Sequence, residues 1–156
     1  MDETPRVSAR QTLDDMRAGY DAFIQKLERS RATSVGEIMG NFFRSQGNPR
    51  VTYAMEEFNP VLTAQVAALA EQLGNYASEE AGALADQALE LMLFYPPSKD
   101  STIASSLTAF EGHALPLVPF LAPERRQELA RRYAKRNSPR LMFPNQKKVW
   151  SALSMR

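Results

Sequence analysis

Residues 59–74 have the sequence NPVLTAQVAALAEQLG, which shows the pattern of one amphipathic helix. An asparagine followed by a proline is a typical helix start, because the side-chain amide caps the first turn and the proline needs no N–H there. A glycine directly after the last apolar position is typical of a helix that ends with a residue in the left-handed backbone conformation. We therefore predict a helix that starts at Asn59 and Pro60 and ends at Gly74. Its buried arc consists of Leu62, Val66, Leu69 and Leu73.

The next segment, residues 78–95, is predicted to form the central helix of the fold. It opens on Ser78, Glu79 and Glu80, which place negative charge at the positive end of the helix dipole. It closes on the run LELMLFY at residues 89–95, which is apolar on nearly every side of a helix. Two prolines follow and stop the helix. A helix that is apolar all round has to be buried between its neighbours.

The N-terminal segment, residues 9–31, is predicted to form an amphipathic helix with a single apolar seam. Ser8 and Gln11 have the spacing of a capping box at its start. The seam residues follow one another at helical intervals and are Leu13, Met16, Tyr20, Phe23 and Leu27. Such a seam packs against other helices of the same chain, or against a second copy in a homodimer. The first alternative is favoured, because about two and a half heptads are short for an independent coiled coil.

The remaining segments complete an all-α fold. Further helices are expected over about 34–46, 101–111, 116–121, 124–136 and 145–153, where capping residues, prolines and apolar spacing recur. Residues 51–58 fit a helix, a strand or a loop, and we prefer helix or loop because a lone strand leaves its backbone groups unpaired. We expect seven or eight helices in a compact helical bundle or a short irregular stack of helical hairpins. All 156 residues belong to one domain in this prediction, with residues 1–8 flexible.

The charge of the chain changes sign along its length. Residues 54–122 carry nine acids against one base, a balance of −8, and residues 123–156 carry ten bases against two acids, a balance of +8. The first 53 residues carry eight bases and seven acids, so the whole chain sums to +1. Opposed fields of this kind can steer a partner, or they can attract each other within one chain or between copies.

The basic third, residues 123–156, contains the first candidate interaction surface. On a helix over 124–136 most bases fall on one side and the apolar residues on the other. Tyr133, Phe143 and Trp150 stand among these bases, a combination that suits phosphates and stacked nucleic-acid bases as well as a protein partner. A solvated face without a partner is the alternative. The candidate binding residues are Arg125, Arg131, Arg132, Lys135, Arg136, Arg140, Lys147 and Lys148.

The acidic third, residues 54–122, contains a second candidate face. Acids gathered on one region can cover a basic groove of a partner or repel nucleic acid from that side of the protein. Adjacent acids point about 100° apart on a helix, so neighbouring glutamates do not share one carboxylate site. The members of this face are Glu56, Glu57, Glu71, Glu79, Glu80, Asp86 and Glu90.

No residue pattern in the chain indicates catalysis or a cofactor. The absence of cysteine excludes disulfides, thiolate metal sites and a cysteine nucleophile. His113 is the only histidine, and its position after Gly112 favours a turn residue over an acid–base catalyst. The seven glycines are scattered singly and form no phosphate-binding loop. We therefore expect no metal, no cofactor and no enzymatic activity, with an enzyme of unknown type as the least favoured alternative.

The chain is expected to be cytoplasmic, with no contact with the membrane interior. Residues 101–123 are poor in charge but include Glu111, Gly112 and three prolines, whereas a membrane span needs about 20 mainly apolar residues. The first residues lack the basic flank and apolar run of a secretory signal.

Together these features predict a non-catalytic protein-binding module that regulates or inhibits a macromolecular partner. The expected partner is another protein or a nucleoprotein complex, such as a nucleic-acid-handling complex, because a chain with one acidic and one basic region can address both kinds of surface there. The alternative is a protein that binds nucleic acid directly through residues 125–148.

Overall fold

The computed structural model describes residues 8–31, 49–94 and 107–155, and in these ranges the chain is helical without any strand. The predicted all-α class is confirmed. The described elements are α1 (Ala9–Arg31), α3 (Pro49–Leu73), α4 (Ser78–Phe94), the 3₁₀ helix η1 (Glu111–Phe120), α6 (Pro123–Arg136), the short 3₁₀ helix η2 (Pro139–Leu141) and α7 (Pro144–Ser154). The predictions for residues 1–7 and 34–46, and most of the helix predicted over 101–111, lie outside the described residues.

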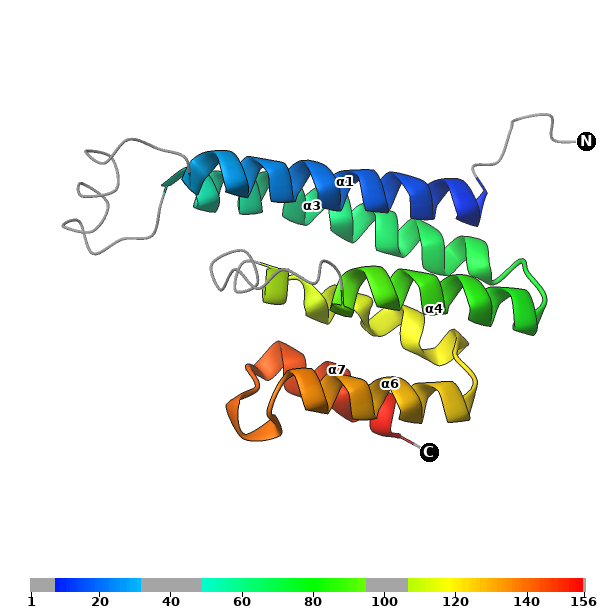
Figure 1. Ribbon diagram of the computed structural model, residues 1–156. Coiled ribbons are helices and arrows are strands. Elements are labelled where there is room, and N and C mark those ends of the chain that lie inside the picture. Colours follow the sequence, from blue (N-terminus) through cyan, green and yellow to red (C-terminus); the bar gives the residue numbers. More distant parts are fainter. Residues whose placement is uncertain (1–7, 32–48, 95–106, 156) are drawn as a thin grey trace, which may run out of the picture.

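The described helices are arranged in three layers, and consecutive long elements run in alternating directions (Figure 1). α1 packs against α3, α4 packs against η1, and α6 packs against α7. η1 also contacts α3 on one side and α7 on the other, so it joins the outer layers. The layer of α6 and α7 consequently lies on the far side of the molecule from α1 and α3 (Figure 1).

α3 shows that the predicted helix start at Asn59 and Pro60 is wrong. The helix begins at Pro49 and runs through Pro60, which lies in its interior. The predicted number of seven or eight helices is slightly off. Residues 51–58, for which we preferred helix or loop, belong to α3 itself. The apolar arc continues backwards through Phe58 and Ala54, which are both buried. Packing of this longer arc against α1 outweighs the backbone hydrogen bond that the proline cannot donate.

Replacing Pro60 with alanine is expected to raise the unfolding free energy by about 1–3 kcal/mol, because a proline inside a helix lacks one hydrogen bond and crowds the carbonyl group four residues earlier. Part of this gain is offset, because proline also restricts the unfolded chain. Urea denaturation of the two proteins measures the difference, and Val61→Ala at the neighbouring exposed position is the control with an effect near zero. A Pro60→Ala protein less stable than the wild type would contradict this account of α3.

The C-terminal end of α3 also differs from the prediction of a left-handed glycine. α3 ends at Leu73, and Gly74 does not have a positive φ. The N–H groups of Gly74, Asn75 and Tyr76 donate to carbonyl groups three residues earlier, at 3.0–3.2 Å. These bonds tighten the chain into 3₁₀ geometry, which satisfies the last carbonyls of the helix without a left-handed residue.

α1 has the predicted bounds, and its seam faces the interior of the chain. The Oγ atom of Ser8 accepts the backbone N–H of Gln11 at 3.1 Å, which caps the first turn. The seam residues are at most 6% exposed and are Leu13, Met16, Tyr20, Phe23 and Leu27. Because α3 and α4 pack against α1, the seam residues make contacts within a single chain.

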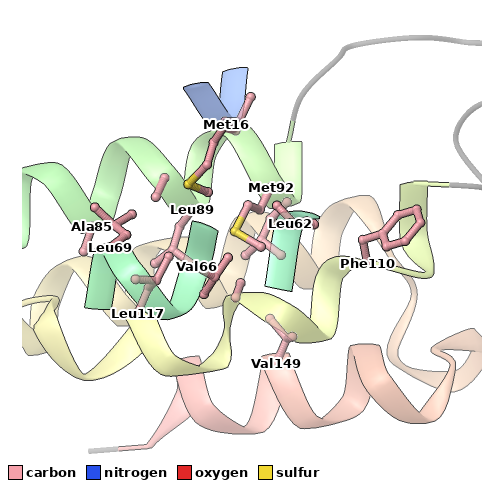
Figure 2. Packing of buried hydrophobic residues seen from close by; sticks show 14 of the residues in the cluster. Met16, Leu62, Val66, Leu69, Ala85, Leu89, Met92, Phe110, Leu117 and Val149 are labelled. Atoms are coloured by element: carbon pink, nitrogen blue, oxygen red, sulfur yellow. The ribbon is translucent and has the colours of Figure 1, made fainter. Parts of the chain in front are cut away.

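One hydrophobic core connects the three layers (Figure 2). α4 is buried on several sides, as predicted for the central helix, and its acids Glu79 and Glu80 stand in the first turn. At one end of the core Phe58 stacks on Phe23, with ring centres 4.7 Å apart. The rings of Tyr20 and Phe110 each meet Phe58 edge-on at 5.1 Å. This aromatic cluster joins α1, α3 and the residues that lead into η1.

η1 occupies the region where a short helix over 116–121 was predicted. Pro116 and Pro119 both lie inside it, and their missing N–H groups interrupt the hydrogen-bond ladder of an α-helix. The longer 3₁₀ stretch is held by burial of Ala114, Leu117 and Val118. The helices predicted over 124–136 and 145–153 are present as α6 and α7, each with a proline in its first turn.

Candidate interaction surface

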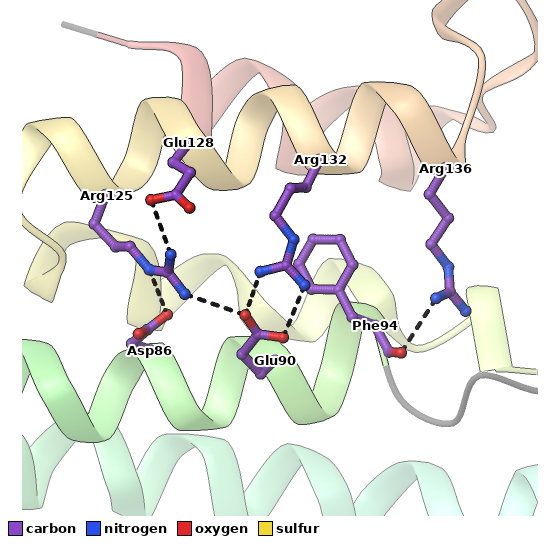
Figure 3. A network of polar contacts seen from close by, with 7 residues as sticks. All are labelled: Asp86, Glu90, Phe94, Arg125, Glu128, Arg132 and Arg136. Carbon is purple, nitrogen blue, oxygen red and sulfur yellow. Dashed lines mark hydrogen bonds and ion pairs between the residues drawn. The ribbon is translucent and has the colours of Figure 1, made fainter.

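The acidic and basic thirds of the chain meet where α6 faces α4 (Figure 3). Arg125 donates to Asp86 at 3.0 Å and to Glu90 at 3.2 Å, and it also pairs with Glu128 of its own helix at 2.9 Å. The hydrogen bond to Asp86 raises the pKa of the Arg125 guanidinium, so this side chain stays charged. The acidic and basic thirds of the chain thus form ion pairs with each other inside one chain.

Arg132 and Arg136 extend this contact towards the end of α4. Arg132 donates to both carboxylate oxygens of Glu90, and its guanidinium lies 4.3 Å from the centre of the Phe94 ring. The hydrogen bond from Arg132 holds the pKa of Glu90 below its usual value. Arg136 donates to the carbonyl oxygen of Phe94 at 3.1 Å, where a cation also complements the helix dipole. We call the contacts of Arg125, Arg132 and Arg136 with α4 the α4–α6 network.

The α4–α6 network uses three of the eight bases predicted to bind a partner. Ion pairs that remain partly open to water contribute only about 0–1 kcal/mol each, so the network orients α6 on α4 more than it stabilises the fold. Sequence spacing placed Arg125, Arg132 and Arg136 on one side of α6, but it did not show that this side faces α4.

The other five bases of the predicted set are exposed. They are Arg131, Lys135, Arg140, Lys147 and Lys148. In the part of the chain that the structure describes, none of them takes part in an ion pair or a side-chain hydrogen bond. Two large apolar side chains stand between them in the chain, Leu141 at 80% exposed and Phe143 at 60% exposed. These seven residues are called the α6–α7 surface below.

A buried carboxyl group lies beneath this surface, between η1, α6 and α7. Glu111 is only 5% exposed. The hydroxyl of Tyr133 donates to its Oε1 atom at 2.9 Å, and Nε2 of Gln146 lies 3.4 and 3.5 Å from its two oxygens. Burial raises the pKa of Glu111 to about 7, although these hydrogen bonds and the charge of Arg136 act in the opposite direction. Burial and the adjacent carboxyl group also raise the pKa of Tyr133.

Glu111, Tyr133 and Gln146 are called the Glu111 cluster below. This cluster positions the start of α7. Oε1 of Gln146 accepts the backbone N–H of Phe143 at 3.0 Å, and its Nε2 also donates to Asn137 Oδ1 at 3.3 Å. The backbone that carries the exposed ring of Phe143 is therefore hydrogen-bonded to a buried side chain. Sequence spacing did not reveal this cluster, although a single acid within the apolar stretch 101–123 is a signal for a buried carboxyl group.

The predicted acidic face is divided by the fold. Asp86 and Glu90 are half-buried in the α4–α6 network. Glu57 pairs with Lys26 of α1 at 3.1 Å. The remaining members are exposed on α3 and α4 and are Glu56, Glu71, Glu79 and Glu80. Glu56 and Glu71 lie on α3, in the layer on the far side of the molecule from α6 and α7, so part of the charge separation in the sequence persists in space.

His113 has a structural contact in η1. Its Nε2 atom lies 2.6 Å from Oδ1 of Asn59, which links η1 to the middle of α3. Among the residues described, no group of three or more histidine or acidic side chains is placed to hold a metal ion. None of the described helices is long and apolar enough to cross a membrane.

Comparison of the chain with protein-family models, curated proteins and solved structures finds no match. A functional proposal for this chain therefore rests on its own side chains and their geometry.

Proposed function

We propose that the protein is a non-catalytic binding module that docks on a protein partner through the α6–α7 surface. The observation that carries this proposal is the exposure of Leu141 and Phe143 in a cationic turn that the buried Glu111 cluster supports. Exposed apolar groups beside charges gain free energy when a partner removes them from water. The bases around them favour a partner with acidic groups at the rim of the contact.

A module of this kind acts by covering part of its partner, so regulation or inhibition is the biochemical role that we propose. A nucleoprotein complex would suit the exposed acids of α3 and α4 as well, because it presents basic protein surfaces to them. Both charged regions of the chain would then contribute to orientation and to the rate of association.

Direct binding of nucleic acid is the alternative, and the geometry supports it less well. Arg125, Arg132 and Arg136 are engaged with α4 instead of facing solvent phosphates. The acids of α4 also lie beside them, and like charges repel a phosphate backbone.

The double substitution Leu141→Ser/Phe143→Ser is expected to weaken partner binding at least about tenfold, because two exposed apolar anchors are lost. The partner is first recovered by copurification from the native host with and without nuclease, and its affinity is then measured by calorimetry. Tyr53→Ser, which removes a 70% exposed ring from α3, is the matched control and should leave the affinity unchanged.

Two results would contradict the proposal. The first is a copurified signal that disappears with nuclease, which would favour the nucleic-acid alternative. The second is a Leu141→Ser/Phe143→Ser protein that binds the recovered partner as tightly as the wild type does.

A further inference from the structure

A groove of about 320 Å³ lies between α6 and α7. Small side chains on α6, Ala130 and Ala134, face the larger ring of Trp150 on α7, and this difference in size leaves the space open. Gln127 and Arg131 line the α6 side, and Ser154 completes the α7 side. The floor is thus mainly apolar, and one guanidinium stands at the rim.

The rim of this groove is cationic. Arg131 is exposed and forms no ion pair in the described part of the chain. Lys135 follows it by four residues on α6, and Lys147 precedes Trp150 by three residues on α7, so helical spacing places each base next to a groove residue. Both lysines are exposed. An apolar floor with a positively charged rim selects for an occupant that has an apolar side chain and negative charges.

We propose that this groove binds an acidic amphipathic segment of the protein partner, with one apolar side chain between Ala134 and Trp150 and a carboxylate at Arg131. The assignment rests on the proposed function and specifies the chemistry of the partner. An amphipathic helix laid in a groove between two helices is a common mode of peptide recognition, and the volume suits one large side chain.

A nucleic-acid strand fits the groove less well. Stacking of successive bases requires open aromatic faces, whereas Trp150 is half-buried and faces alanines across the groove. An aliphatic side chain gains more than a polar base edge from the alanine part of the floor, because the methyl groups of Ala130 and Ala134 offer apolar area without hydrogen bonds.

Trp150 supplies a direct reporter for the test, because it is the only tryptophan in the chain. The probe is a synthetic peptide of about four helical turns with leucines at i, i+3, i+4 and i+7 spacing and glutamates elsewhere. The expected result is a saturable change of Trp150 emission that weakens with added salt. The same peptide with lysine in place of every glutamate should produce no such change.

Substitutions in the groove locate the binding site. Ala134→Glu and Arg131→Glu are each expected to weaken binding of the acidic peptide at least about tenfold. Ala134→Glu places a charged side chain where the partner's apolar side chain should lie, and Arg131→Glu places a carboxylate opposite the partner's carboxylate. Arg131→Lys keeps the charge, and Ala67→Glu adds the same acid at an exposed position of α3, so both controls should remain within about twofold of wild type.

Three results would overturn the groove assignment. They are equal binding of the lysine peptide, unchanged affinity in Ala134→Glu, and displacement of the acidic peptide by an oligodeoxythymidine that itself shifts the emission of Trp150. If the native partner still binds Ala134→Glu but not Leu141→Ser/Phe143→Ser, the proposed function stands and the groove assignment fails. If the native partner still binds Leu141→Ser/Phe143→Ser but not Ala134→Glu, the groove assignment stands and the apolar turn is not the anchor.

Discussion

The Phe58→Ala protein is expected to lose about 3–5 kcal/mol of unfolding free energy, the range measured when large aromatic side chains are removed from protein cores. Phe58 is 7% exposed and lies at the centre of the aromatic cluster. Its ring contacts Tyr20, Phe23 and Phe110, so removal leaves a cavity bounded by α1, α3 and the start of η1. Each lost aromatic pair adds about 0.5–1.5 kcal/mol to the effect of burial alone.

Urea denaturation followed by circular dichroism measures this loss. The matched control is Tyr53→Ala, five residues earlier in the same helix, which removes a ring that is 70% exposed and should change stability by less than about 0.5 kcal/mol. A Phe58→Ala protein destabilised no more than the Tyr53→Ala control would show that the four rings do not form a common core.

The second large effect concerns pH and Glu111. The pKa of Glu111 is raised from 4.5 to about 7 in the folded protein, so the folded state binds a proton more tightly than the unfolded chain does. Its contribution to stability is fully present below the unfolded pKa and is lost as the pH rises through the folded pKa. Between pH 5 and pH 8 the unfolding free energy is expected to fall by about 2–3 kcal/mol because of this single group.

Glu111→Gln is expected to remove most of this pH dependence, because the amide keeps an acceptor for Tyr133 but does not ionise. The charged or titratable groups that face Glu111 are Tyr133 and Arg136 of α6 and Tyr20 of α1. Burial raises the pKa values of both tyrosines further above this pH range. The comparison is made in a His113→Asn background, which removes the only histidine of the chain.

Urea denaturation at pH 5 and pH 8 provides the measurement. At pH 5 the Glu111→Gln protein should be close to the parent protein in stability, and at pH 8 it should be the more stable of the two. An unchanged difference between the two pH values in Glu111→Gln would assign the pH dependence to other groups.

Most of the helices that the structure describes could be predicted, because their signals are local. Each of these signals acts within one turn of the backbone, and the structure has helices that begin at them. They are the capping group of Ser8, the acids Glu79 and Glu80, and the first-turn prolines of α6 and α7. Pro60 is the instructive exception. Its local signal of a helix start is as strong as the others, but burial of Ala54 and Phe58 against α1 continues the helix through it.

The candidate surface was predictable only in part. Helical spacing identified the cationic side of α6, yet it could not show that Arg125 and Arg132 pair with Asp86 and Glu90 of α4, some 40 residues away in the chain. It also could not show that Arg136 donates to the carbonyl oxygen of Phe94. The spacing likewise could not place Gln146 next to Glu111, which lies 35 residues earlier.

The sequence alone determined three features, which are the all-α class, the apolar seam of α1 and the opposed charge of the two later thirds. Helical periodicity sets the first two, and the third is a simple sum of charges. Tertiary structure decided which bases are paired with α4 and which remain in water at Arg131, Lys135 and the turn around Leu141. It also decided that Glu111 is buried. Pairing and desolvation depend on which helix faces which, and that is set when apolar faces from distant segments pack into one core.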